Sequence, residues 1–271
     1  MADYREFLRI LANQEPGRAV GFEYAWDRSL AEQLLWRKGA HLWAEEKARA
    51  CSLAETALRC RMDCVVLELL EEDGVFPGLE GLGEVLPQGM KAAAGMRAGF
   101  FETGGDLGAF RRGYEKLAGD PAVCAVIVRD RGEAVPGKED FLEISRELTA
   151  AVHSLGKPCI WADCGQEPVP LDWAAGCGFD AVHLTGAYTA ETAELWREYH
   201  EEFAILGDTR LSWLKNQEPS RIIAYCEALQ ALTGNKGFAF GMGNPQGEPV
   251  PYLSYISTLS ALVRGQSAEK P

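Results

Sequence analysis

Two carboxylates stand where short apolar stretches of this chain end, and both are candidates for acid–base chemistry. Glu68 lies near the end of the stretch 64–69, and Asp163 directly follows the stretch 158–162. A carboxyl group placed in this way acts as a general acid or base when its surroundings raise its pKa. Each residue could instead cap the next helix or pair with an arginine, so the residues alone leave both interpretations open.

Three arginines are candidate binding groups for an anionic ligand. Arg129 and Arg131 come directly after the apolar run 122–128, and Arg210 follows a later one. A guanidinium can bind a carboxylate or a phosphate through two parallel hydrogen bonds. Charges of alternating sign are also typical of a solvated loop. The arginines therefore predict a small anionic molecule as partner, with a surface loop as the alternative.

Aromatic, amide and thiol side chains complete the set of candidate site residues. Tyr24 and Trp26 follow the first apolar stretch and could stack on a flat ligand or cover the end of the fold. Asn244 ends a glycine-rich run whose backbone could approach a ligand. Cys164 could bind a metal, react as a thiol, or fill space as a small apolar group. His183 has apolar neighbours on both sides, which favours a core histidine with one hydrogen-bonded nitrogen over a catalytic one.

Alternating apolar strands and amphipathic helices must position these residues. Continuous apolar strands between helices predict a parallel sheet buried on both faces. Eight such units predict a single-domain α/β TIM barrel over residues 1–265, followed by a disordered tail at 266–271. The predicted strands are 18–24, 64–69, 91–97, 122–128, 158–162, 180–184, 203–206 and 237–241. The predicted helices are 4–13, 28–61, 106–118, 139–155, 170–177, 189–200, 217–232 and 251–264. The carboxyl ends of barrel strands share one face, where the candidate residues would meet.

The net charge and the cysteines limit the classes of function that this chain can have. The 271 residues carry a formal net charge of -13, which disfavours nucleic acid and anionic membrane surfaces as partners. The sequence contains no run of about 18 apolar residues that could span a membrane. The eight cysteines are dispersed without a Cys-x-x-Cys pair, and the chain starts with polar and charged residues. We therefore expect reduced thiols and a cytoplasmic location.

Several short motifs, in their order and spacing, resemble the uroporphyrinogen decarboxylase superfamily. Cys164 and Gly165 match the end of a strand that often reads His-x-Cys-Gly in that family, and the segments 176–180 and 237–255 resemble a later turn and the closing stretch. Residues 139–264 carry most of the resemblance, and the chain looks like a short, divergent member. The resemblance implies a barrel that decarboxylates or binds a small carboxylate-bearing ligand, such as a tetrapyrrole of the porphyrin pathway, without a cofactor.

In that decarboxylase-like interpretation, the candidate residues take two roles. The resemblance implies that an acid protonates the ligand, that arginines hold its carboxylates, and that carbon dioxide leaves. Asp163 or Glu68 would supply the acid, and Arg129, Arg131 and Arg210 would hold the ligand.

A second activity within the superfamily is methyl transfer between a corrinoid protein and a thiol. The methyltransferases hold a thiol-activating zinc with His-x-Cys and a later cysteine, whereas this chain has Ala162 in place of the histidine and no cysteine in 239–248. Cys164 is then the only candidate ligand. Because a catalytic zinc usually takes three protein ligands, we expect no metal cofactor. The third alternative is a degenerate barrel that binds a ligand or a corrinoid protein without turnover.

Overall fold

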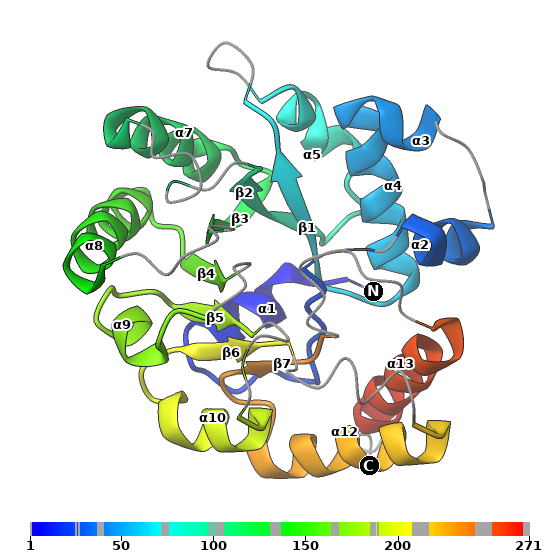
Figure 1. Ribbon diagram of the computed structural model, residues 1–271. Helices are drawn as coiled ribbons and strands as arrows, with labels where there is room; N and C mark the ends of the chain where they lie inside the picture. The colour runs from blue at the N-terminus through cyan, green and yellow to red at the C-terminus, as the bar shows by residue number, and fades with distance from the viewer. Residues whose placement is uncertain are drawn as a thin grey trace.

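Seven parallel strands form one curled sheet, and helices surround it as an outer ring (Figure 1). The computed structural model describes residues 2–24, 26, 28–36, 41–71, 76–97, 100, 106–130, 137–163, 168–184, 188, 190–207, 217–241 and 251–267. The strands follow one another across the sheet in sequence order. Such an order requires a crossover connection between each pair of neighbours, which is the α/β organisation expected from the sequence.

The seven strands match seven of the eight stretches that the sequence predicts. They are β1 (Cys64–Leu69), β2 (Lys91–Met96), β3 (Val123–Asp130), β4 (Cys159–Asp163), β5 (Ala181–His183), β6 (Ala204–Leu206) and β7 (Phe238–Ala239). Their inner and outer faces are both buried, which explains why their sequences are continuously apolar. β3 is longer than expected, because it continues through Arg129 and Asp130.

The helices confirm the predicted alternation and differ from it at one long element. They are α1 (Tyr4–Leu11), α2 (Arg28–Leu35), α3 (His41–Ala44), α4 (Glu46–Arg59), η1 (Pro77–Leu79), α5 (Leu82–Val85), α7 (Leu107–Gly119), α8 (Lys138–Ser154), α9 (Leu171–Ala175), α10 (Thr192–Tyr199), α12 (Pro219–Thr233) and α13 (Tyr252–Ser267). The predicted helix 28–61 is divided, because Trp36 adopts a left-handed backbone conformation with φ of 57° directly after α2. None of the described helices combines the length and apolar character needed to cross a membrane.

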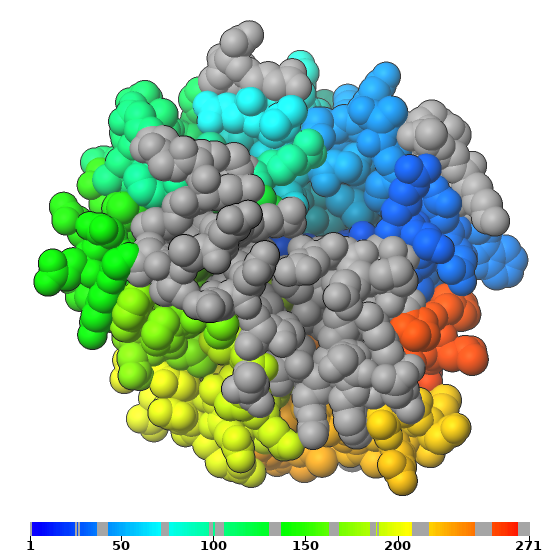
Figure 2. Space-filling view, in the orientation of Figure 1, coloured from blue at the N-terminus to red at the C-terminus, as the bar shows by residue number. Residues whose placement is uncertain are grey.

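The carboxyl-terminal helix α13 lies beside the amino-terminal third of the chain (Figure 1 and Figure 2). There the ring of Tyr255 meets the ring of Trp26 edge-on, with 5.5 Å between their centroids. α13 continues to Ser267, so residues 266 and 267 of the expected disordered tail are helical. α13 therefore lies in the outer ring next to elements from the amino-terminal third of the chain.

The stretch 18–24, predicted as the first strand, lies beside β7 but forms only one bridge with it. Gly21 pairs with Phe240 in parallel, and the Phe22 amide donates to the Phe240 carbonyl at 2.6 Å. No ladder joins residues 18–24 to β1, both of which are fully described. A Cβ at Gly21 would overlap the Met62 sulfur, so the Met62 side chain occupies space between the stretch and the start of β1. The expected eight-stranded sheet is thus a seven-stranded one whose remaining gap this stretch covers.

A separate apolar cluster fills the inside of the curled sheet. Side chains alternate along each strand, so Cys64 and Val66 join this inner cluster while Val65 and Leu67 pack toward the helices. α1 contributes to the inner cluster as well, and its residue Phe7 stacks on Phe22 at 5.3 Å. Six strand positions of the cluster are alanine: Ala93, Ala125, Ala162, Ala181, Ala204 and Ala239. Alanine is thus the commonest inward-facing residue of the strands.

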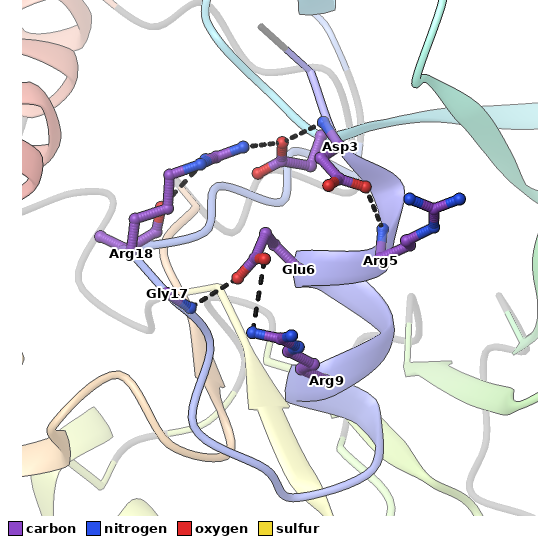
Figure 3. Close-up of polar contacts among 8 residues, drawn as sticks. Asp3, Arg5, Glu6, Arg9, Gly17 and Arg18 are labelled. Carbon is purple, nitrogen blue, oxygen red and sulfur yellow. Dashed lines mark hydrogen bonds and ion pairs between the residues drawn. The ribbon is translucent and has the colours of Figure 1, made fainter.

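A buried ion pair ties residues 18–24 to the start of β1. Arg18 donates to the Asp63 carboxylate, which also accepts the Asp3 amide at 2.8 Å (Figure 3). The Asp63 side chain is 0% exposed. Burial raises the pKa of this carboxyl, and the hydrogen bond from Arg18 opposes that rise. The pair replaces the missing strand ladder with a side-chain contact.

We expect Arg18→Ala to lower the free energy of unfolding by about 2–4 kcal/mol, because it leaves the Asp63 carboxylate buried without its counter-ion. Arg28→Ala is the matched control, since Arg28 forms an exposed i,i+4 pair with Glu32 at 2.9 Å; its loss should cost less than about 0.5 kcal/mol. Urea unfolding of both variants measures the difference. Equal, small effects would show that the Arg18–Asp63 contact does not hold this edge of the sheet.

Candidate functional site

The polar side chains inside the sheet gather toward the carboxyl ends of the strands. Glu68 belongs to β1, Arg129 to β3 and His183 to β5, and Tyr24 ends the stretch 18–24. Each lies two residues beyond a member of the inner apolar cluster, so strand alternation turns it inward. These cluster members are Phe22, Val66, Ile127 and Ala181. Four separate segments therefore bring polar groups to one end of the interior.

Glu68 accepts two hydrogen bonds at one carboxylate oxygen. The Tyr24 hydroxyl donates to Glu68 Oε1 at 2.8 Å, and Arg129 Nη1 donates to the same oxygen. The Arg129 side chain is 2% exposed and that of Glu68 is 20% exposed. Because both charges are largely removed from water, loss of either residue would leave the other poorly compensated. This cluster of Tyr24, Glu68 and Arg129 is called the acid–arginine cluster below.

Gly95 lies on the strand between Glu68 and Arg129. β2 lies between β1 and β3, and its residue Gly95 is opposite Glu68 on one side and Ile127 on the other. A Cβ at Gly95 would come within 2.6 Å of the Ile127 carbonyl oxygen, a separation that side chains do not tolerate. The strand between the two charged residues therefore carries no side chain at this level, and the Arg129 side chain reaches Glu68 across it.

His183 is fully buried against two aromatic rings. Its ring centroid lies 4.9 Å from that of Tyr24 with an interplanar angle of 29°, and 5.7 Å from that of Phe22. Neither ring nitrogen has a hydrogen-bond partner among the residues that the structure describes. Burial lowers the pKa of His183 to about 3, so the ring is neutral at neutral pH, with one donor and one acceptor nitrogen. The predicted core position is confirmed, whereas the predicted hydrogen bond is not found within the described part of the chain.

The other candidates predicted from the sequence fall into two groups. Trp26 is half-buried and packs against Tyr255, which places it among the helices rather than in the acid–arginine cluster. The backbone of Asp163 ends β4, opposite Asp130 of β3. Outside the described part of the structure lie the Asp163 side chain and four whole residues: Arg131, Cys164, Arg210 and Asn244.

Sequence reasoning found three members of this site but missed two determinants. Arg129 is a buried strand residue and not part of a solvated loop. No local sequence pattern marks Gly95, because its role depends on which strands lie beside it. His183 was assigned to the core, although the two-residue spacing from Ala181 was a signal that it faces the same interior as Glu68.

The described residues offer no ready metal centre. No group of three or more His, Cys, Asp and Glu side chains is placed to hold a metal ion within the described ranges. Burial raises the pKa of Cys60 and of Cys124 to about 12, so these thiols remain protonated. Cys164 lies outside these ranges, and the expected absence of zinc stays a prediction.

The solved structures that resemble this fold include two enzymes. A methyltransferase from Methanosarcina mazei superposes with a TM-score of 0.69 at 10% sequence identity, over 96% of this chain and 97% of that chain. A sugar phosphate isomerase/epimerase from Parabacteroides distasonis gives a TM-score of 0.54 at 9% identity, over 93% of this chain and 97% of that chain. No protein-family model matches the sequence, and no curated protein matches it. The likeness supports a methyltransferase-like fold of TIM-barrel type, and membership of the decarboxylase family itself stays a prediction.

We expect His183 to make the protein less stable in mild acid. The folded-state pKa of about 3 lies below the unfolded value of 6.5, so stability is complete above pH 6.5 and is lost as pH falls toward 3. Between pH 7 and pH 5 this residue should remove about 2 kcal/mol of unfolding free energy. His183→Phe, which keeps an aromatic ring, should reduce the pH dependence by that amount in urea titrations. Parallel pH profiles for the two proteins would contradict the predicted shift.

We also expect purified protein to contain no stoichiometric zinc. Ala162 replaces the histidine that the family resemblance implies as a ligand, and a catalytic zinc usually needs three protein ligands. Metal analysis of the protein and of Cys164→Ala tests this expectation. About one zinc per chain, lost on that substitution, would show a metal site.

Proposed function

We propose that the chain is a methyltransferase-like barrel protein that binds a small carboxylate-bearing molecule at the carboxyl ends of its strands. The observation that carries the proposal is the acid–arginine cluster, in which Arg129 and Glu68 are held inside the sheet with the Tyr24 hydroxyl. Proteins of TIM-barrel type place their ligands at this end of the strands. A guanidinium has five N–H donors, so a ligand carboxylate can share Arg129 with Glu68.

Glu68 supplies a group that can exchange a proton beside the bound ligand. A ligand carboxylate on Arg129 would lie next to the Glu68 carboxyl group, within reach of proton transfer. The hydrogen bond from Tyr24 holds the Glu68 oxygen in position during that exchange. Arg129 is thus the proposed anchor and Glu68 the proposed acid or base.

Methyl transfer is the reaction that we favour for this site. The likeness to the methyltransferase from Methanosarcina mazei extends over nearly all of both chains, which supports this choice over decarboxylation. When a thiol accepts a methyl group, its S–H bond breaks as the new S–C bond forms, and the donor keeps the electron pair of its broken bond to carbon. Glu68 would take the released proton. A corrinoid protein is the methyl donor that the family resemblance implies.

Binding of succinate tests the proposed anchor. We expect Arg129→Ala to weaken succinate binding by about ten- to a hundredfold, the loss typical of one charge-assisted contact. Because that variant leaves Glu68 uncompensated, the double variant Glu68→Gln with Arg129→Met removes both charges and should lose affinity to a similar extent. Arg111→Ala is the control, since Arg111 forms an exposed pair with Glu115 at 2.9 Å. Unchanged affinity in both Arg129 variants would refute the proposed anchor.

Measuring turnover distinguishes the three remaining interpretations: methyl transfer, decarboxylation and binding without catalysis. Mercaptoacetate carries both a thiol and a carboxylate, and methylcobalamin supplies a methyl group, so their incubation with the protein should yield the methyl thioether. Glu68→Gln should slow this reaction more than it weakens binding, because the amide cannot accept the proton. Carbon dioxide release from a polycarboxylate would support decarboxylation instead. Binding without any product would support a barrel that has lost catalysis.

A further inference from the structure

Arg129 and His183 lie at the same level of the sheet with one small residue between them. Residue pairing places Arg129 opposite Ala162, and Ala162 opposite His183. Neighbouring strands are about 4.8 Å apart, so the two backbones are separated by about 10 Å. Both side chains face the interior, and the intervening strand contributes only the methyl group of Ala162. Tyr24 joins the two groups, because its hydroxyl donates to the Glu68 oxygen that Arg129 also binds and its ring stacks on His183 at 4.9 Å. A molecule bound at the acid–arginine cluster would therefore lie close to His183.

The described neighbours of His183 pack closely against its ring but give its two nitrogens no hydrogen-bond partner. The aromatic rings of Phe22 and Tyr24 pack against it, and its neighbour in β6 is Leu206. Gly207 lies so close to the ring that an added Cβ would be 3.1 Å from Nε2, yet a glycine has no side chain to donate or accept there. A neutral imidazole needs one acceptor and one donor as partners. Few native proteins leave such a buried group unsatisfied without a functional reason or a bound guest.

We propose that His183 is the second binding point of this site and hydrogen-bonds a hydroxyl group of the ligand whose carboxylate Arg129 holds. The inference rests on the proposed function and specifies its ligand class as small hydroxycarboxylates. A hydroxyl both donates and accepts, so it matches either tautomer of the ring. A carboxylate would be a poorer partner for the His183 ring itself, because it only accepts and would place a charge against Phe22 and Ala162.

Malate and succinate form a matched pair that tests the proposal, because they differ by one hydroxyl group. We expect the wild-type protein to bind malate about three- to tenfold more tightly than succinate, the value of one neutral hydrogen bond. His183→Phe keeps the stacked ring and should bind the two with equal affinity. His183→Asn, which retains a donor and an acceptor, should recover part of the preference.

His200→Phe is the control variant for this experiment. Like His183, His200 stacks on an aromatic ring, that of Trp196 at 4.3 Å, but it lies after α10 on the outside of the sheet. This variant should keep the full preference for malate. Isotope-labelled histidine adds a direct measurement, since malate should shift the ring-nitrogen signals of His183 more than succinate does.

The outcomes separate this inference from the function on which it rests. If wild-type protein binds both acids equally, or if His183→Phe still prefers malate, His183 does not read the hydroxyl, and carboxylate binding by Arg129 stands. If malate binds without shifting the His183 signals, the ring nitrogens do not hydrogen-bond the ligand, and the inference is overturned. If neither acid binds, the proposed function fails, and the inference fails with it.

Discussion

The side chains of a β-strand alternate between its two faces, and in this protein that alternation decides which residues meet inside the curled sheet. Val66 faces inward, so Glu68 must also face inward, and Ala181 does the same for His183. The sheet register then sets the levels at which these residues lie. A shift of one residue in any strand would exchange its interior and exterior faces. The site thus depends on the same packing that stabilises the fold.

Each end of the interior holds a carboxylate paired with an arginine. At one end Asp63 is paired with Arg18, and at the other Glu68 is paired with Arg129. His183 has no charged partner among the described residues and stays neutral because burial lowers its pKa. A buried ion pair contributes little net stability compared with apolar packing. Its presence inside a sheet where alanine is the commonest interior residue therefore favours a functional role for Arg129 and Glu68.

Likeness of fold and likeness of function are separate questions for this chain. A methyltransferase and a sugar phosphate isomerase/epimerase resemble it at 10% and 9% identity, and barrels of this type support many chemistries on one scaffold. Barrels of this type bind their ligands at the carboxyl ends of the strands, and we propose the same end for this chain. The identity of that ligand depends on a few interior side chains, of which Tyr24, Arg129 and His183 are the most informative here.

The sequence by itself determined the order and type of most elements, because apolar runs and helical periodicity are local properties. It also located Glu68, Arg129 and Tyr24, since each follows or ends an apolar stretch. Tertiary structure alone decided their partners. Glu68 and Arg129 are 61 positions apart, and they meet because the curled sheet brings β1 and β3 to either side of β2, whose Gly95 has no side chain. The fully buried, unsatisfied state of His183 likewise depends on neighbours brought together by the curl of the sheet, which no local pattern encodes.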